Sequence, residues 1–288
     1  METKAGDPGA FAHFDLSRVD TPAFVVDAAK LRANCQILAE IRDEAGIKML
    51  SALKAFSMWS TAPIIGEYLD GVCTSGLWEA RLASEFYDGE ISTYCAAYKP
   101  EELEEVARLS DHVIFNSPGQ MRRAALILEQ ARASGGGFDV GLRINPQVPT
   151  GEVPRYDPSS PGSRLGFPLD QLTEEHMEGV EGIHFHNLCE QGFEPLHRTW
   201  DRVFATPRKI PAPRFTSNRG RRSRWMPAFW WAPFSIRAKT TGLSRSPTFP
   251  PHATCRTLSR RRTALRCCTR KLASLRFDWA APPAWQAM

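Results

Sequence analysis

Short apolar runs alternate with helical patterns along residues 21–190, and this alternation constrains the fold more than any other feature of the chain. The first six runs recur about every 20 to 27 residues, and all seven are rich in β-branched or apolar side chains: AFVVD, IKMLSAL, GVCTS, ISTYCAA, HVIFN, DVGLRIN and GIHFHNL. Strands separated by helices indicate βα units and a parallel sheet. Seven candidate strands, with no GxGxxG after the first, fit an incomplete (β/α)8 barrel better than half of a Rossmann fold.

Four helical segments lie between these runs. The segment at residues 27–46 has Asp27 as its predicted N-cap and stops at Gly46, and the segment at 75–89 is expected to begin at Ser75 in the same way. The other two occupy residues 99–111 and 117–137. A Pro-, Gly- and Ser-rich stretch at 146–167 interrupts the pattern, and loops of this length are often functional.

The pattern stops near residue 201, where the charge balance also reverses. Residues 202–288 hold 19 of the 36 Lys and Arg but only 1 of the 32 acidic residues. We therefore divide the chain into a lead-in (1–20), a partial barrel (21–201) and a basic, poorly ordered tail (202–288). The seven cysteines form no CxxC motif, and no apolar stretch resembles a signal peptide or is long enough to span a bilayer. A cytoplasmic protein without a metal site, disulfide framework or membrane segment is expected.

Several polar residues lie where a barrel places its active site. Lys54 follows an apolar strand, where a desolvated lysine can form a Schiff base, although a lysine that snorkels to solvent fits equally. His184 and His186 face one side of a strand and could contact a planar cofactor or serve as core histidines. Arg143 could face an anion or a buried carboxylate, and Glu79 could simply complement its helix dipole.

Together these residues occur in stretches that resemble a known family: TPAFVVD, LSALKAFSMWS, YLDGVCTSGLWEARLA, GLRINP, PGSRLGF and GIHFHNLCEQGFEPLHRTW. The family is the carboxynorspermidine/carboxyspermidine decarboxylases, pyridoxal-phosphate (PLP) enzymes of the alanine-racemase-like barrel type, fold type III. The resemblance covers roughly residues 21–200. ALKAFSMWS and HFHNLCEQ distinguish it from the diaminopimelate and ornithine decarboxylases.

The resemblance implies specific roles for five residues. Lys54 would be the Schiff-base lysine and His186 the histidine that stacks on the PLP ring. Three further residues would lie near the cofactor: Glu79, Arg143 and Cys189. The implied reaction is decarboxylation of carboxynorspermidine or carboxyspermidine to norspermidine or spermidine, in polyamine biosynthesis, by a homodimer.

Residues 202–288 lack the motifs that this family places after RTW. Read one base out of phase, however, three segments permit them in the family's order: YLEPGEAVALDAGVLVG from residues 214–236, SATCHMPDVL from 249–259 and RLGGPSCLAGD from 276–288. We therefore predict that the chain is out of frame from between residues 202 and 214 onward. The chain would then lack the C-terminal β-domain that the resemblance implies. It would also lack the glutamate of the family's PGEA motif and the cysteine that reaches into the partner subunit's site. We therefore predict an impaired or inactive enzyme.

Two other interpretations remain open at this stage. The excess of arginine, interleaved with Trp and Phe, also suits a C-terminal arm that binds nucleic acid, although no helix-turn-helix, zinc or RNA-binding signature organises it. A diaminopimelate- or ornithine-type decarboxylase relative would share the barrel but is disfavoured by ALKAFSMWS. The sequence does not separate carboxynorspermidine from carboxyspermidine as the substrate.

Overall fold

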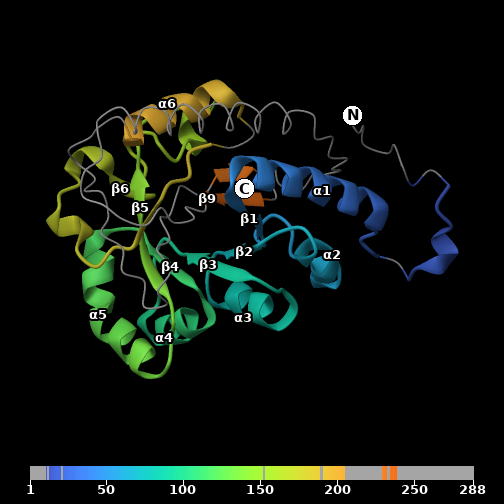
Figure 1. The fold of residues 1–288 in the computed structure, drawn as a ribbon, viewed down its shortest axis with the longest axis horizontal. Helices are drawn as coiled ribbons and strands as arrows, with labels where there is room; N and C mark the ends of the chain where they lie inside the picture. Colours follow the sequence, from blue (N-terminus) through green and yellow to red (C-terminus); the bar gives the residue numbers. More distant parts are fainter. Residues whose placement is uncertain are drawn as a thin grey trace.

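Six strands lie parallel in one curved sheet, and each neighbour in the sheet is also the next of these strands along the chain (Figure 1). The computed structural model describes residues 11, 13–20, 22–151, 153–188, 191–204, 229–231 and 234–238. The six strands are β1 (Ile47–Ala52), β2 (Gly71–Thr74), β3 (Glu90–Tyr94), β4 (His112–Phe115), β5 (Asp139–Asn145) and β7 (Gly182–His184). Sequential parallel strands that curl in this way form part of a (β/α)8 barrel, which confirms the predicted fold class.

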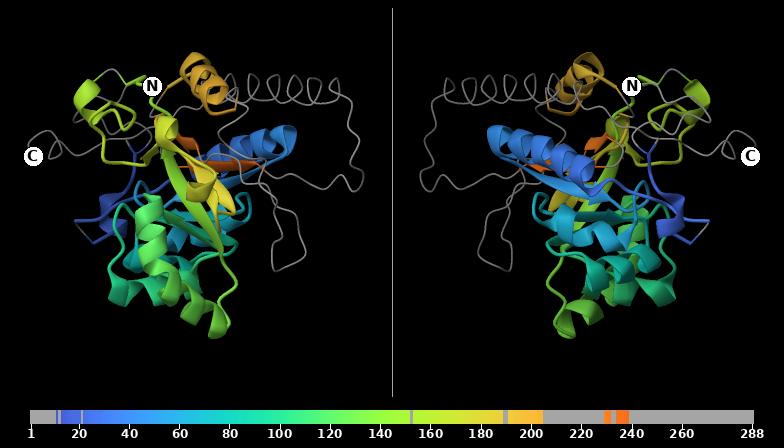
Figure 2. Two further views of the ribbon diagram at one scale, coloured as in Figure 1. Left: turned by 90° about the vertical axis from the view of Figure 1, so that its left-hand side faces the viewer. Right: turned by 90° about the vertical axis from the view of Figure 1, so that its right-hand side faces the viewer.

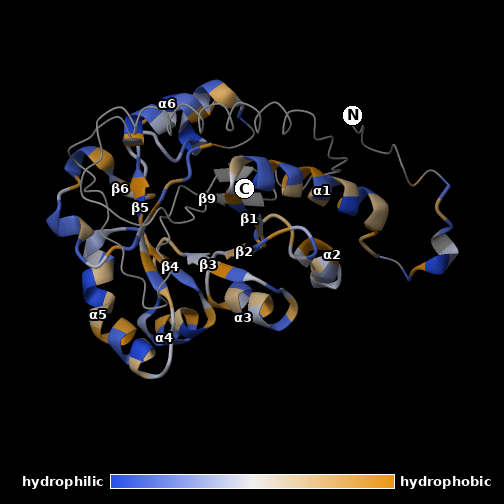
Figure 3. Ribbon diagram, viewed as in Figure 1, coloured by the Kyte–Doolittle hydropathy of each residue, from blue (hydrophilic) through white to orange (hydrophobic). Residues whose placement is uncertain are grey.

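Helices cover the outer face of this sheet (Figure 2). They are α1 (Ala28–Ala45), α2 (Ala62–Gly66), α3 (Leu77–Phe86), α4 (Pro100–Leu109), α5 (Pro118–Ala133) and α6 (Phe193–Phe204). Hydrophobic and hydrophilic residues alternate around α3, α4 and α5, as expected for helices that pack one face against a sheet (Figure 3). The short strand β6 (Phe167–Pro168) pairs with the last two residues of β5, after the long loop.

Capping interactions explain where α1 begins and ends. The Asp27 carboxylate accepts the backbone N–H groups of Ala29 and Lys30, and Gly46 ends α1 in the left-handed conformation, both as predicted. Ser75 is not a cap, contrary to the prediction. Gly76, at φ 158°, precedes α3 instead, because only glycine readily adopts that extended positive-φ backbone.

The predicted strand AFVVD is the one run that forms no strand. Residues 23–27 carry no regular secondary structure, and the Phe24 side chain is 89% exposed. A strand needs a hydrogen-bonded neighbour, and among the described residues none pairs with this segment. The prediction was wrong because β-branched composition alone does not supply that neighbour.

Side chains alternate between the two faces of each strand, and this separates the core from the barrel interior. In β5, Val140, Leu142 and Ile144 belong to the apolar clusters under the helices. Arg143 lies between them in sequence and therefore points to the opposite, inner face. The inner face can thus carry polar groups without disrupting the packing of helices on the outer face.

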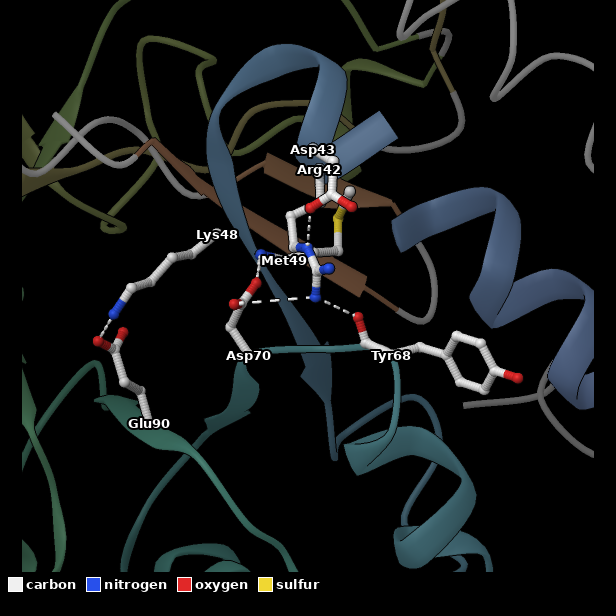
Figure 4. Close-up of polar contacts among 7 residues, drawn as sticks. All are labelled: Arg42, Asp43, Lys48, Met49, Tyr68, Asp70 and Glu90. Atoms are coloured by element: carbon white, nitrogen blue, oxygen red, sulfur yellow. Dashed lines mark hydrogen bonds and ion pairs between the residues drawn. The ribbon is translucent and has the colours of Figure 1, made fainter. Parts of the chain in front are cut away.

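Acidic side chains at the starts of strands tie neighbouring strands together. The Asp70 carboxylate, just before β2, accepts the backbone N–H of Met49 in β1 at 2.8 Å, as Figure 4 shows. Glu181, just before β7, likewise accepts the N–H of Val140 in β5 at 2.9 Å. Arg42 supports the first of these contacts, because its guanidinium lies 3.9 Å from Asp70 and donates to the Tyr68 carbonyl. These bonds specify which residues of adjacent strands face each other.

Two short strands in the basic region cover the outer edge of β1. β8 (Phe229–Trp231) and β9 (Phe234–Ala238) form an antiparallel pair, and β9 runs antiparallel to β1. β9 therefore gives β1 a neighbour from beyond residue 201, where the βα pattern was expected to stop. Most of the basic tail lies outside the described residues, so its proposed disorder and its nucleic-acid alternative stay predictions.

Candidate functional site

Polar side chains from several strands meet at the carboxyl-terminal edge of the sheet. Arg143 of β5 is the direct register partner of His184 of β7, so both project from the same level of the inner face. Tyr94, the last residue of β3, contacts both of them: its ring stacks on the His184 ring and lies under the Arg143 guanidinium. In (β/α)8 barrels this edge is where active sites form.

The Arg143 side chain is buried without an acidic partner. It is 4% exposed, and among the described residues no ion pair joins it to a carboxylate. Its Nη2 donates to the His186 carbonyl at 3.2 Å, and its guanidinium carbon lies 4.5 Å from the centre of the Tyr94 ring. Its Nε, also buried, has no hydrogen-bond partner in the described part of the chain. Burial consequently lowers the pKa of Arg143, and the site holds an incompletely satisfied cation.

Both histidines beside Arg143 are held in the neutral form. Burial, together with the positive charges of Arg143 and Lys54, lowers the pKa of His186 to about 3. Burial also lowers the pKa of His184 well below its ordinary value, with the charge of Arg143 adding to the effect. The His184 ring stacks on Tyr94 at 5.2 Å between centroids and 24° between planes. The effect of Lys54 on His186 shows that the lysine charge acts on this cluster.

Lys54 lies in the loop that follows β1, and Glu79 lies in the first turn of α3, the helix that follows β2. Lys54 lies two residues beyond the end of its strand, where the sequence predicts it, but it is exposed, as in the snorkelling alternative, and is not desolvated in this structure. The Glu79 carboxylate accepts the backbone N–H of Ser75 at 2.7 Å, so it orders the turn before α3. Cys189, the remaining predicted site residue, lies outside the described residues.

Tyr94 is the functional candidate that sequence reasoning missed. Its hydroxyl donates to Asn116 Oδ1 at 2.8 Å, and the same oxygen accepts the backbone N–H of Gly166 at 2.7 Å. Asn116 Nδ2 donates to the Arg164 carbonyl at 2.9 Å. The signal that could have found Tyr94 is the one that pointed to Lys54, namely a polar residue at the carboxyl end of an apolar strand.

Two other kinds of site were tested on the described residues. No group of His, Cys, Asp and Glu in this part of the chain could hold a metal ion. Nor does any described helix have the length and apolar character needed to cross a membrane. The polar cluster around Arg143 is therefore the site that the described structure offers for chemistry.

The fold and site together define a barrel of the fold type III decarboxylase class. The crystal structure of diaminopimelate decarboxylase from Helicobacter pylori has the same fold, with a TM-score of 0.53 and 19% identity over 65% of this chain and 50% of that chain. No family model matches the sequence.

Within that class the chain is homologous to the carboxynorspermidine/carboxyspermidine decarboxylases. It is 38% identical to the Campylobacter jejuni protein of that name over 179 residues, which is 62% of this chain and 45% of the relative. The crystal structure of carboxynorspermidine decarboxylase complexed with norspermidine from Campylobacter jejuni gives a TM-score of 0.56 at 35% identity, over 66% of this chain and 48% of that one. The chain thus spans about half the length of the curated relatives that it matches.

Proposed function

We propose that this chain derives from a PLP-dependent decarboxylase that converts carboxynorspermidine or carboxyspermidine into norspermidine or spermidine in polyamine biosynthesis. The observation that supports the proposal is the contact of a buried Arg143 with the neutral His186, whose pKa the Lys54 charge also lowers, at the carboxyl edge of a barrel homologous to such enzymes. A neutral imidazole, a buried cation and a primary amine are among the groups that a phosphorylated pyridine aldehyde requires.

The described residues fit this cofactor. In the part of the chain that the structure describes, the buried Nε–H of Arg143 has no partner, which favours an anionic or acceptor group at the inner face. His186 is uncharged and offers a planar face, and Lys54 supplies the amine for covalent attachment. Glu79 and Cys189 are proposed to lie near the cofactor. When bound, PLP provides an electron sink for the charge left by loss of CO₂.

These side chains would serve binding and orientation, and other groups must complete the reaction. Arg143 and His186 would hold the cofactor against the inner face, away from solvent. Residues 202–288 lack, in the present frame, the motifs that would supply the remaining groups. Those groups are a phosphate-binding loop, a carboxylate for the ring nitrogen and an acid for the polyamine tail. We infer low or no turnover for the chain as it stands. A cytoplasmic homodimer is part of the same proposal.

Borohydride trapping tests cofactor binding independently of turnover. The full chain is mixed with PLP, reduced with borohydride and digested, and the labelled lysine is identified by mass spectrometry. We expect the label on Lys54 and its loss in Lys54→Met. Lys99→Met removes a surface lysine that pairs with Glu102 and serves as the matched control. Equal labelling of Lys54 and Lys99 would argue against the site.

A CO₂-release assay tests the reaction and the substrate class. Carboxynorspermidine, carboxyspermidine and diaminopimelate are compared at equal concentration with the PLP-treated chain. We expect little or no release from any of them, and any residual release should favour the two carboxylated polyamines. Normal turnover would overturn the inferred impairment, and a preference for diaminopimelate would overturn the proposed substrate.

A further inference from the structure

Tyr94 connects the buried cation of the site to a distant segment of the chain. One face of its ring receives the Arg143 guanidinium at 4.5 Å, and its ring also stacks with His184 at 5.2 Å. Its hydroxyl binds Asn116, whose side chain holds the backbone of Arg164 and Gly166. A single side chain therefore contacts both the inner face and the anchor of the segment at residues 164–166.

The geometry gives the ring and the hydroxyl of Tyr94 separate tasks. The guanidinium of Arg143 donates to a backbone carbonyl and lies over the electron-rich face of the Tyr94 ring, and the Tyr94 side chain also interacts with its charge, so Tyr94 is a major constraint on its position. The hydroxyl shares Asn116 Oδ1 with the Gly166 N–H. Gly166 adopts φ 83° close to the backbone of Ile144 and Asn145, so the segment tolerates little displacement at this point.

We propose that Tyr94 is a positioning residue that orients Arg143 through its ring and orders residues 164–166 through its hydroxyl. Occupation of the site at Arg143 and order in this segment are then thermodynamically linked. The linkage to PLP rests on the proposed function, whereas the coupling of Tyr94 to residues 164–166 does not. Arg164 itself is exposed, so its peptide bond reports on that order.

Limited trypsin digestion of the full chain measures the order directly. Trypsin cuts after Arg164, whose carbonyl Asn116 holds, and after Arg155 in the same long loop, where Tyr156 is 76% exposed. We expect Tyr94→Phe to raise cleavage after Arg164 by about threefold to tenfold, as expected for loss of one hydrogen bond, with cleavage after Arg155 unchanged. Tyr156→Phe is the matched control and should change neither rate. An unchanged rate after Arg164 in Tyr94→Phe would overturn the proposal.

PLP titration, followed by absorbance, separates the two tasks. Tyr94→Phe keeps the ring and should bind PLP about twofold to threefold more weakly than the parent chain, whereas Tyr94→Leu, which loses the ring as well, should bind about tenfold more weakly. PLP should protect the bond after Arg164 in the parent chain and less so in Tyr94→Phe. Equal affinity in Tyr94→Leu, with a parent-like circular dichroism spectrum, would contradict the orienting role. If PLP binds no variant, the proposed function fails, and the cleavage rates without PLP decide the Tyr94 proposal alone.

Discussion

The Asp111 carboxylate accepts the backbone N–H of Ile91 at 3.0 Å, and the Asp111 N–H donates back to the Ile91 carbonyl at 2.8 Å. This reciprocal pair joins the start of β4 to β3, and Asp70 with Met49 repeats it between β2 and β1. The acidic side chain satisfies an N–H that the curved sheet would otherwise leave unpaired. Its removal should therefore be costly.

Asp111→Ala should lower the free energy of unfolding by about 1–3 kcal/mol, because the N–H of the buried Ile91 loses its partner. Urea denaturation followed by circular dichroism measures the change. Asp88→Ala, at an exposed position, is the control and should stay within about 0.5 kcal/mol of the parent. Equal effects of the two substitutions would show that the strand-start bond is not stabilising.

Gly71→Ala should prevent normal packing of β2 against β3. Gly71 has φ 149°, and an added Cβ would overlap the Glu90 backbone. The cost should exceed about 3 kcal/mol, seen as loss of soluble protein or a sharply lower melting temperature. Gly162→Ala, where no atom lies within 4 Å of the added Cβ, should be close to neutral. A stable Gly71→Ala protein would contradict the tight β2–β3 register.

His184 and His186 should make the protein less stable as the pH falls. Their folded-state pKa values lie below the ordinary value of 6.5, so the unfolded chain binds protons first. The free energy of unfolding should fall between pH 6.5 and 5, by about 1.4 kcal/mol per pH unit for each histidine at most.

Urea midpoints measured across this pH range test the histidine effect. His184→Gln and His186→Gln should each flatten the slope, whereas His13→Gln, at an exposed position, should leave it unchanged. A slope identical in all three variants would show that neither buried histidine gains its proton on unfolding.

Cys35 should resist alkylation in the folded protein. Its thiol is fully buried in the cluster beneath α1, and burial raises its pKa to about 11, so roughly one part in a thousand is thiolate at pH 8. Iodoacetamide should label the partly exposed Cys73 and Cys95 first, and Cys35 only after urea unfolding. Mass spectrometry of the labelled peptides gives the order, and early labelling of Cys35 would argue against this helix–sheet packing.

The nucleotide sequence tests the reading-frame hypothesis. We expect a single frame change between codons 202 and 214, after which the alternative frame encodes the PGEA, CHMPD and GGPxCxAGD motifs in that order. A gene with no such motifs in any frame would contradict the hypothesis. Restoring the frame should raise CO₂ release from carboxynorspermidine or carboxyspermidine well above that of the present chain.

Sequence periodicity predicted most of the fold because packing constraints repeat along this chain. Six of the seven predicted strands and all four predicted helices occur, since each helix needs one apolar face and each strand needs an apolar outer face. The failures have local causes. Gly76, and not the predicted Ser75, is the N-cap of α3, because the backbone there adopts a positive φ that favours glycine. The segment AFVVD forms no strand because it has no neighbouring strand among the described residues.

The site was only partly predictable because its contacts join strands far apart in the chain. Lys54, Arg143 and His186 could be predicted from their positions at strand ends and from the family resemblance. The stacking of Tyr94 on His184 joins residues 90 positions apart, and no local pattern encodes such a contact. The neutral state of His186 likewise depends on burial and on charges contributed by β5 and the loop after β1.

The acidic residues at the strand starts have a consequence for how such a barrel can change. Asp70, Asp111 and Glu181 set the alignment of the strands from one end of the sheet, while Arg143, His186 and Lys54 lie toward the other end. Alignment and chemistry are therefore encoded by separate sets of residues. Substitutions at the carboxyl rim can alter ligand preference while the strand alignment persists, so new specificities are accessible through single steps that leave the scaffold intact.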